Sequence, residues 1–269
     1  MTKMKSPYNI GFVTFGDGSP NWRITAKRLK KLALTSNLFC RVSALQLEDL
    51  NFFLTKDEKQ WMRKTRGFGY WLWKSMAILK FASENQSLDL ILYMDAGCHI
   101  NLNPEALQKF EEYCNLAKHN GILAFRTQHL ERDWSKNDLL NLFETDYSMS
   151  GQFLGAILMG TPEKISELAR HWLELSRVQS YHFLDDSPSL IPNYIGFKEH
   201  RHDQSILSLL LKERSIAEAL ESEVYFESWD NGKKYPFWTT RHVSYIPFED
   251  RYKPKWRTRL IQFILSKFL

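Results

Sequence analysis

The feature that most constrains the fold is a short apolar run that ends at an acidic residue. Residues 88–94, Leu-Asp-Leu-Ile-Leu-Tyr-Met, are apolar except for Asp89, and Asp95, Ala96 and Gly97 follow at once. A run of this length is typical of a strand that is buried on both faces of a sheet. Ligands of open α/β sheets bind beyond the carboxyl ends of the strands, so Asp95 is placed to hold one. A structural alternative stays open, in which Asp95 only caps the turn that follows.

The order of the remaining segments predicts a mostly parallel sheet. The chain opens with an expected strand over 8–15, a turn over 16–20, a helix over 21–35 and a strand over 39–45. A β-turn-α-β opening is the start of a parallel sheet. We expect further helices over 47–62, 104–118, 162–176 and within 128–146, and further strands over 121–125, within 147–160, over 223–227 and within 239–246. The fold class predicted from this alternation is α/β, with a mixed, mostly parallel central sheet flanked by helices.

The chain length suits one large α/β domain. It has 269 residues and no apolar stretch near the ~18 residues that a membrane span needs. We assign residues 1–252 to this domain and residues 253–269 to a basic, amphipathic tail. The tail either attaches the protein to an anionic membrane face or packs back onto the domain.

Cysteine usage and charge indicate the compartment and the kind of partner. The three cysteines, Cys40, Cys98 and Cys114, are odd in number and lack zinc-site spacing, which favours a reducing cytosol. The expected location is therefore cytoplasmic, including the inner face of the membrane. The net charge of +5 is modest and suits a small anionic substrate or a membrane surface, and we expect no nucleic-acid partner.

An unusual run lies at residues 66–74, Arg-Gly-Phe-Gly-Tyr-Trp-Leu-Trp-Lys. Its cations, Arg66 and Lys74, suit a diphosphate, and its aromatic side chains suit a base or a sugar. The alternative is a glycine-hinged turn whose Phe68 and Trp71 belong to the core. The chain has neither a dinucleotide fingerprint nor a P-loop, so the common glycine-rich phosphate motifs are excluded.

A polar head precedes an apolar helical run at residues 199–211. It places Asp203 and Gln204 at a helix N-terminus, where anions are favoured. The structural alternative is that Asp203 is only the N-cap of this helix. Hydrolase chemistry is not indicated, because there is no Gly-x-Ser-x-Gly elbow and the histidines at 200 and 202 lack zincin spacing.

Taken together, the run at 66–74, the segment Leu-Tyr-Met-Asp-Ala-Gly-Cys and the segment His-Asp-Gln-Ser resemble nucleotide-sugar glycosyltransferases of the GT-A type. The resemblance is to those of bacterial surface polysaccharide synthesis and, more distantly, to the glycogenin-like group. It covers roughly residues 10–211 and implies a GT-A-like, Rossmann-like fold. Asp95 matches the first acid of the family's Asp-x-Asp, and Gly97 stands where the second acid is expected.

The resemblance implies a role for each matching position. The residues implied to contact the donor are Thr14, Gly16, Arg66, Tyr70, Lys74, Asp95, Ala96 and Gly97. The acceptor-side residues are Gly151, Gln152 and Gly155, and the catalytic pair is Asp203 and Gln204. Asp95 and, by its order in the chain, His242 are the implied ligands of Mn²⁺ or Mg²⁺. In an inverting enzyme Asp203 would be the general base, and in a retaining one Asp203 or Gln204 would position the sugar or stabilise charge.

The leading hypothesis is a hexosyltransferase that moves a sugar from a nucleoside-diphosphate donor, UDP-sugar favoured, to a hydroxyl of a saccharide or a lipid-linked acceptor. One alternative is a sugar-phosphate nucleotidyltransferase, although the chain lacks the glycine-rich loop of that class after its first strand. Another is a non-catalytic sugar-binding protein that has lost its metal site, as Gly97 suggests.

Overall fold

The computed structural model describes residues 6–240, and residues 1–5 and 241–269 lie outside the described part. Three expectations fall largely or wholly outside it: the candidate ligand His242, the strand within 239–246 and the helical tail over 253–269. The division into a domain over 1–252 and a tail therefore stays a prediction. Within the described residues, no helix has both the length and the apolar character needed to cross a bilayer.

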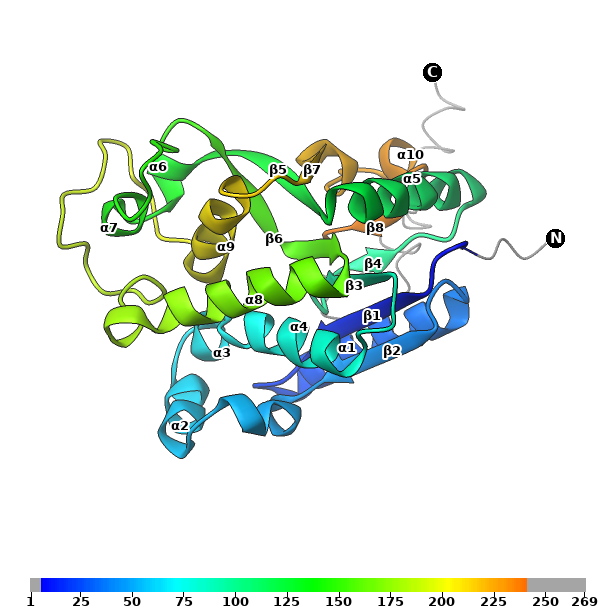
Figure 1. The fold of residues 1–269 in the computed structure, drawn as a ribbon, viewed down its shortest axis with the longest axis horizontal. Coiled ribbons are helices and arrows are strands. Elements are labelled where there is room, and N and C mark those ends of the chain that lie inside the picture. Colours follow the sequence, from blue (N-terminus) through cyan, green and yellow to red (C-terminus); the bar gives the residue numbers. More distant parts are fainter. Residues whose placement is uncertain (1–5, 241–269) are drawn as a thin grey trace, which may run out of the picture.

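The centre of the molecule is a mixed sheet. Within residues 6–240, six strands follow the spatial order β2-β1-β3-β6-β5-β7 (Figure 1). They are β1 Ile10–Phe15, β2 Arg41–Leu45, β3 Leu90–Met94, β5 Ile122–Leu130, β6 Gly151–Gly160 and β7 Ala217–Leu220. Strand β6 runs antiparallel to both of its neighbours, and the other five run in one direction. The predicted mixed, mostly parallel α/β sheet is confirmed.

Helices cover both faces of this sheet. One face packs against α4 (Trp73–Glu84), α8 (Pro162–Arg177) and α9 (His202–Lys212), and the other against α1 (Pro20–Ser36) and α5 (Pro104–Asn120). The short helices are α2 Lys56–Lys64, α3 Gly67–Tyr70, α6 Glu131–Trp134, α7 Asn137–Leu140 and α10 Trp229–Gly232, with 3₁₀ turns η1 Leu47–Phe53, η2 Val178–Tyr181 and η3 Glu221–Glu223. A small sheet joins β4 (His99–Ile100) to β8 (Phe237–Trp238).

The side chains of β3 show why its sequence is continuously apolar. Ile91 and Tyr93 belong to the core on the α4–α8–α9 face, whereas Leu90, Leu92 and Met94 belong to the core on the α1–α5 face. Successive residues of a strand point to opposite faces, so a strand covered on both sides has no polar position. The strand ends where the apolar run ends, at Met94, and Asp95 therefore lies at the edge of the sheet.

The single helix predicted over 47–62 is wrong, because the segment breaks in the middle. Turn η1 ends at Phe53, and α2 begins at Lys56 with Thr55 as its N-cap. The Thr55 hydroxyl accepts the Glu58 N–H, and the Glu58 carboxylate accepts the Thr55 N–H, which forms a capping box. This box satisfies backbone groups at a new helix start, so it separates the two elements.

Two further predictions are corrected by strand pairing. The helix expected within 128–146 is replaced at its start by β5, which runs to Leu130 because Arg126 and Leu130 pair with Phe153 and Gly151 of β6. Two one-turn helices, α6 and α7, follow it. The strand expected over 223–227 lies earlier, over residues 217–220, where its backbone pairs with β5.

Candidate functional site

Asp95 lies directly beyond the carboxyl end of β3, beside the end of β1. Strand β2 lies on one side of β1 and β3 lies on the other, so the order in which the chain adds strands reverses at this point. The Asp95 N–H donates to the Ala156 carbonyl at 2.8 Å, and the Asp95 carbonyl accepts the Cys98 N–H at 2.9 Å. These bonds fix the turn, and the Asp95 side chain stays 30% exposed.

Lys74 joins Asp95 to Asp203 through its ammonium group. Its Nζ lies 3.2 Å from Asp95 Oδ2, 2.9 Å from Asp203 Oδ2 and 3.1 Å from the Gly155 carbonyl oxygen. The contacts with Asp95 and Gly155 are hydrogen bonds, and the contact with Asp203 is an ion pair. The Lys74 side chain is nearly buried, and burial alone would lower its pKa, but the two carboxylates outweigh burial and hold it above its ordinary value.

Asp203 is the buried end of this acid–lysine–acid cluster. Its side chain is 6% exposed. Burial raises the pKa of Asp203 to about 6, helped by the charge of Asp95 and opposed by the charge of Lys74. It is the second residue of α9, so the sequence placed it correctly at a helix start. A carboxylate with a pKa near neutrality is suited to accept and release a proton.

Tyr93 holds the other oxygen of Asp95. Its hydroxyl donates to Asp95 Oδ1, and burial together with the Asp95 charge raises the pKa of this phenol far above its ordinary value. The sequence reasoning did not single out Tyr93. The signal was present, because residues two apart on a strand share one face and Tyr93 is two positions before Asp95.

Gln204 and Gln152 belong to a buried polar network. Gln204 Oε1 accepts the Gly155 N–H at 3.1 Å, and Gln204 Nε2 donates to Gln152 Oε1 at 3.0 Å. Gln152 is fully buried and donates to Glu131 Oε2 at 3.0 Å. Glu131, also fully buried, pairs with Lys212. Sequence reasoning missed Glu131, which was placed in an expected helix of the 128–146 segment.

The three predicted acceptor-side residues therefore lie in different surroundings. Gly155 contacts the Lys74 cluster through its carbonyl, and a Cβ added to it would lie 3.4 Å from Asp203 Oδ2. A Cβ on Gly151 would lie 2.2 Å from the Thr127 carbonyl oxygen, so this glycine is required by the packing of β6 on β5. Gln152 faces the interior. Only Gly155 lies against the cluster.

The predicted donor-side residues near β1 pack closely. Thr14 is fully buried, and its hydroxyl has no hydrogen-bond partner within the described part of the chain. A Cβ on Gly16 would lie 2.4 Å from the Trp22 carbonyl oxygen, so only glycine fits where β1 meets α1. The carbonyls of Ala96 and Gly97 accept hydrogen bonds from Arg28 and Thr240, respectively.

The 66–74 run forms a left-handed turn. Five consecutive residues from Gly67 to Trp71 have φ angles between 48° and 89°. Three of them are not glycine, and this conformation costs such residues roughly 1–2 kcal/mol each. The turn packs the rings of Tyr70 and Trp71 on His202, with ring centroids at 4.9 and 5.5 Å. His202, the residue before Asp203, thereby contacts two aromatic side chains.

Arg66 lies apart from the Lys74 cluster in this structure. Its guanidinium is half exposed and lies 3.8 Å from Asp186 and 3.6 Å from Glu199. These contacts tie the left-handed turn to the loop before α9. Its predicted contact with donor phosphates stays a prediction.

Residues 6–240 do not provide a full set of ligands for a divalent cation. Within this range, no group of three His, Cys, Asp or Glu side chains is placed to hold a metal ion. Both oxygens of Asp95 already accept hydrogen bonds, from Tyr93 and Lys74, and the Lys74 ammonium lies between the two carboxylates. The described residues therefore do not fit the metal that the resemblance implies.

The sequence matches no protein-family model and no curated protein. Among solved structures, it is similar to mouse xyloside xylosyltransferase 1 in its apo form, with a TM-score of 0.43 and 17% identity, over 79% of this chain and 84% of that one. It is also similar to a glycosyltransferase involved in glycosylation of the major capsid of PBCV-1, with a TM-score of 0.46 and 12% identity, over 90% and 96%. The bifunctional glycosyltransferase WbbM, in its apo structure, gives 0.45 and 12%, over 81% of this chain and 40% of WbbM. Each of these three is a glycosyltransferase, and at such identities and TM-scores the likeness assigns this chain no activity.

Proposed function

We propose that this protein is a glycosyltransferase that moves a sugar from a nucleoside-diphosphate donor to a hydroxyl of a saccharide or lipid-linked acceptor. The observation that supports it best is the cluster at the sheet edge. Asp95 and Asp203, far apart in the sequence, lie on either side of the Lys74 ammonium, 3.2 and 2.9 Å from it. The cluster stands where ligands of open α/β sheets bind.

In this proposal the acceptor oxygen attacks the anomeric carbon of the donor sugar. The new carbon–oxygen bond forms as the bond to the diphosphate breaks, and the nucleoside diphosphate leaves with the bonding electrons. For an inverting transfer, Asp203 takes the proton of the acceptor hydroxyl, since its pKa of about 6 leaves it mostly ionised at neutral pH. Lys74 is a positioning residue, because its ammonium contacts Asp95, Asp203 and the Gly155 carbonyl together.

Asp95→Asn is the test of this assignment, and Asp89→Asn is its matched control. The two acids flank the same strand at opposite ends, and Asp89 accepts the Asn9 N–H and pairs with Lys118. A panel of nucleotide sugars is screened for UDP or GDP release, with Mn²⁺ and with a chelator. We expect turnover in wild type and Asp89→Asn, and a loss of at least about 100-fold in Asp95→Asn, the order seen when one electrostatic group of an active site is removed.

Two results would contradict the proposal. Turnover of Asp95→Asn at the wild-type rate would remove Asp95 from the site. Release of pyrophosphate from UTP and a sugar phosphate, without release of UDP from any nucleotide sugar, would instead identify a nucleotidyltransferase.

A further inference from the structure

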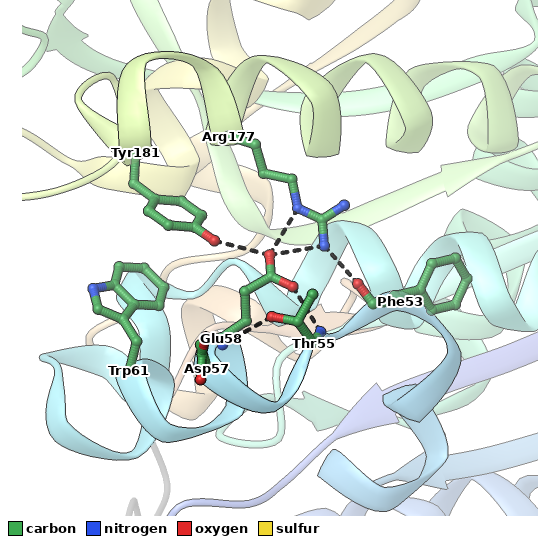
Figure 2. Close-up of a pocket in the computed structure, with 7 residues that line it drawn as sticks. All are labelled: Phe53, Thr55, Asp57, Glu58, Trp61, Arg177 and Tyr181. Carbon is green, nitrogen blue, oxygen red and sulfur yellow. Dashed lines mark hydrogen bonds and ion pairs between the residues drawn. The ribbon is translucent and has the colours of Figure 1, made fainter.

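A pocket lies on the α2 side of the molecule, and none of the Lys74 cluster residues lines it. Its volume of about 580 Å³ falls in the range of small-molecule sites, ≈ 300–1,000 Å³. The residues that line it are Phe53, Thr55, Asp57, Glu58, Trp61, Arg177 and Tyr181 (Figure 2). They come from η1, α2, the end of α8 and η2, so the pocket forms only in the folded chain.

One wall of this pocket is aromatic. Trp61 and Tyr181 stack with ring centroids 4.3 Å apart and ring planes at 17°, and both rings stay partly exposed. Tyr181 ends a run of three residues, from Gln179, with φ angles of 50°, 56° and 73°. A left-handed run without glycine is costly and persists only when the surroundings impose it, as they often do at binding sites.

The pocket also has a polar side, which is held by hydrogen bonds. Glu58 accepts from Arg177 Nε at 3.0 Å, from the Tyr181 hydroxyl at 2.8 Å and from the Thr55 N–H at 2.9 Å (Figure 2). Asp57 lines the pocket beside this network. An aromatic face next to hydrogen-bonding groups suits a sugar ring, which presents C–H groups on its face and hydroxyl groups at its edge.

The charge of the pocket disfavours a nucleotide as its ligand. Asp57 and Glu58 outnumber the one cation, Arg177, so the lining carries a net negative charge. Like charges repel, so phosphate groups are disfavoured here. A neutral saccharide has no such penalty.

A row of rings leads from the pocket to the catalytic cluster. Trp61 contacts Tyr70 with ring centroids at 5.9 Å, and Tyr70 contacts His202 at 4.9 Å. His202 directly precedes Asp203. Its Nε2 is buried without a hydrogen bond in the described chain, and Asp186 Oδ1 lies 3.5 Å from it. His202 Nδ1–H donates to the Leu184 carbonyl at 2.8 Å, so Nε2 is the acceptor nitrogen of the neutral ring.

We propose that the Trp61–Tyr181 pocket binds the distal sugar units of an oligosaccharide acceptor, whose reacting end reaches Asp203 along this row. The inference rests on the proposed function. It moves the acceptor site away from Gln152, which is fully buried, and from Gly151, where the Thr127 carbonyl oxygen lies in the direction of a side chain. It also predicts that longer saccharides are better acceptors than single sugars.

The test uses the full chain and a printed panel of neutral monosaccharides and oligosaccharides, followed by calorimetric titration of the oligosaccharides that bind. Trp61→Leu removes the central ring, and Asp57→Ala changes the polar side in case the first variant folds poorly. Tyr225→Leu is the matched control, because it removes an exposed aromatic side chain, 60% exposed, beyond β7. Circular dichroism and urea unfolding report whether each variant is folded.

We expect wild type and Tyr225→Leu to bind oligosaccharides more tightly than the corresponding monosaccharides. Trp61→Leu is expected to weaken oligosaccharide binding about tenfold, and Asp57→Ala severalfold. In transfer assays, Trp61→Leu is expected to raise KM for oligosaccharides more than it changes kcat.

The inference is overturned if no oligosaccharide binds, if UDP competes for the same site, or if folded Trp61→Leu and Asp57→Ala both bind like wild type. Its failure is separable from that of the proposed function. Oligosaccharide binding lost in Trp61→Leu, with no nucleoside diphosphate released from any donor, would refute transfer and keep the pocket. Transfer with no effect of Trp61→Leu would refute the pocket and keep transfer.

Discussion

We expect the free energy of unfolding of Asp203→Asn to increase relative to that of wild type as the pH rises. Burial raises the pKa of Asp203 from its ordinary 3.8 to about 6 in the folded state. Between these two values the folded protein keeps a proton that the unfolded chain has released. The unfolded state then binds fewer protons, so wild-type stability falls as the pH rises through this window.

The size of this effect follows from the same two values. At about 1.4 kcal/mol per pH unit, a pKa change from 3.8 to about 6 corresponds to about 3 kcal/mol. This cost is absent below about pH 4 and complete above about pH 7. Asparagine stays neutral throughout, so Asp203→Asn lacks this pH-dependent loss. The variant also lacks the contact with Lys74. This loss changes the free energy of unfolding by the same amount at each pH between about 4 and about 7, because Lys74 stays charged there.

Urea unfolding at several pH values, followed by tryptophan fluorescence, measures the free energy of unfolding of both proteins. The difference between Asp203→Asn and wild type should grow by about 3 kcal/mol from about pH 4 to about pH 7 in favour of the variant. Glu144→Gln, a carboxylate-to-amide change at an exposed position, serves as the control. A difference for Asp203→Asn that is flat with pH would refute the claim that burial raises this pKa. A variant that is more stable and less active would show that Asp203 is kept for function.

Two further variants test the contacts of the same cluster. Lys74→Met leaves Asp95 and Asp203 near each other without a cation, which should cost about 3–5 kcal/mol of unfolding free energy at neutral pH; a cost near zero in urea unfolding would show that the ammonium is not needed. Tyr93→Phe removes only the hydroxyl that donates to Asp95, so we expect a loss of about 1 kcal/mol in the same assay and a weaker affinity for nucleotide sugars by titration; unchanged values of both would make this hydrogen bond irrelevant.

Much of the fold follows from local sequence signals. The continuous apolar run at 88–94 defines β3, and Pro104 and Pro162 stand at the first positions of α5 and α8 as proline prefers. These signals depend on residues close together in the chain, so they can be read without the tertiary structure. The break at Thr55 was also local, since its capping box lies within four residues, and it was overlooked.

The sequence by itself determined the fold class. It also placed Asp95 at the end of a strand and Asp203 at the start of a helix. Only the tertiary structure decided what these acids contact. The ammonium of Lys74 reaches both because α4, β3 and α9 pack around one point, and the burial of Gln152 follows from the pairing of β6 with β5. Such contacts join residues far apart in the chain, and their geometry is set by packing, which no local pattern encodes.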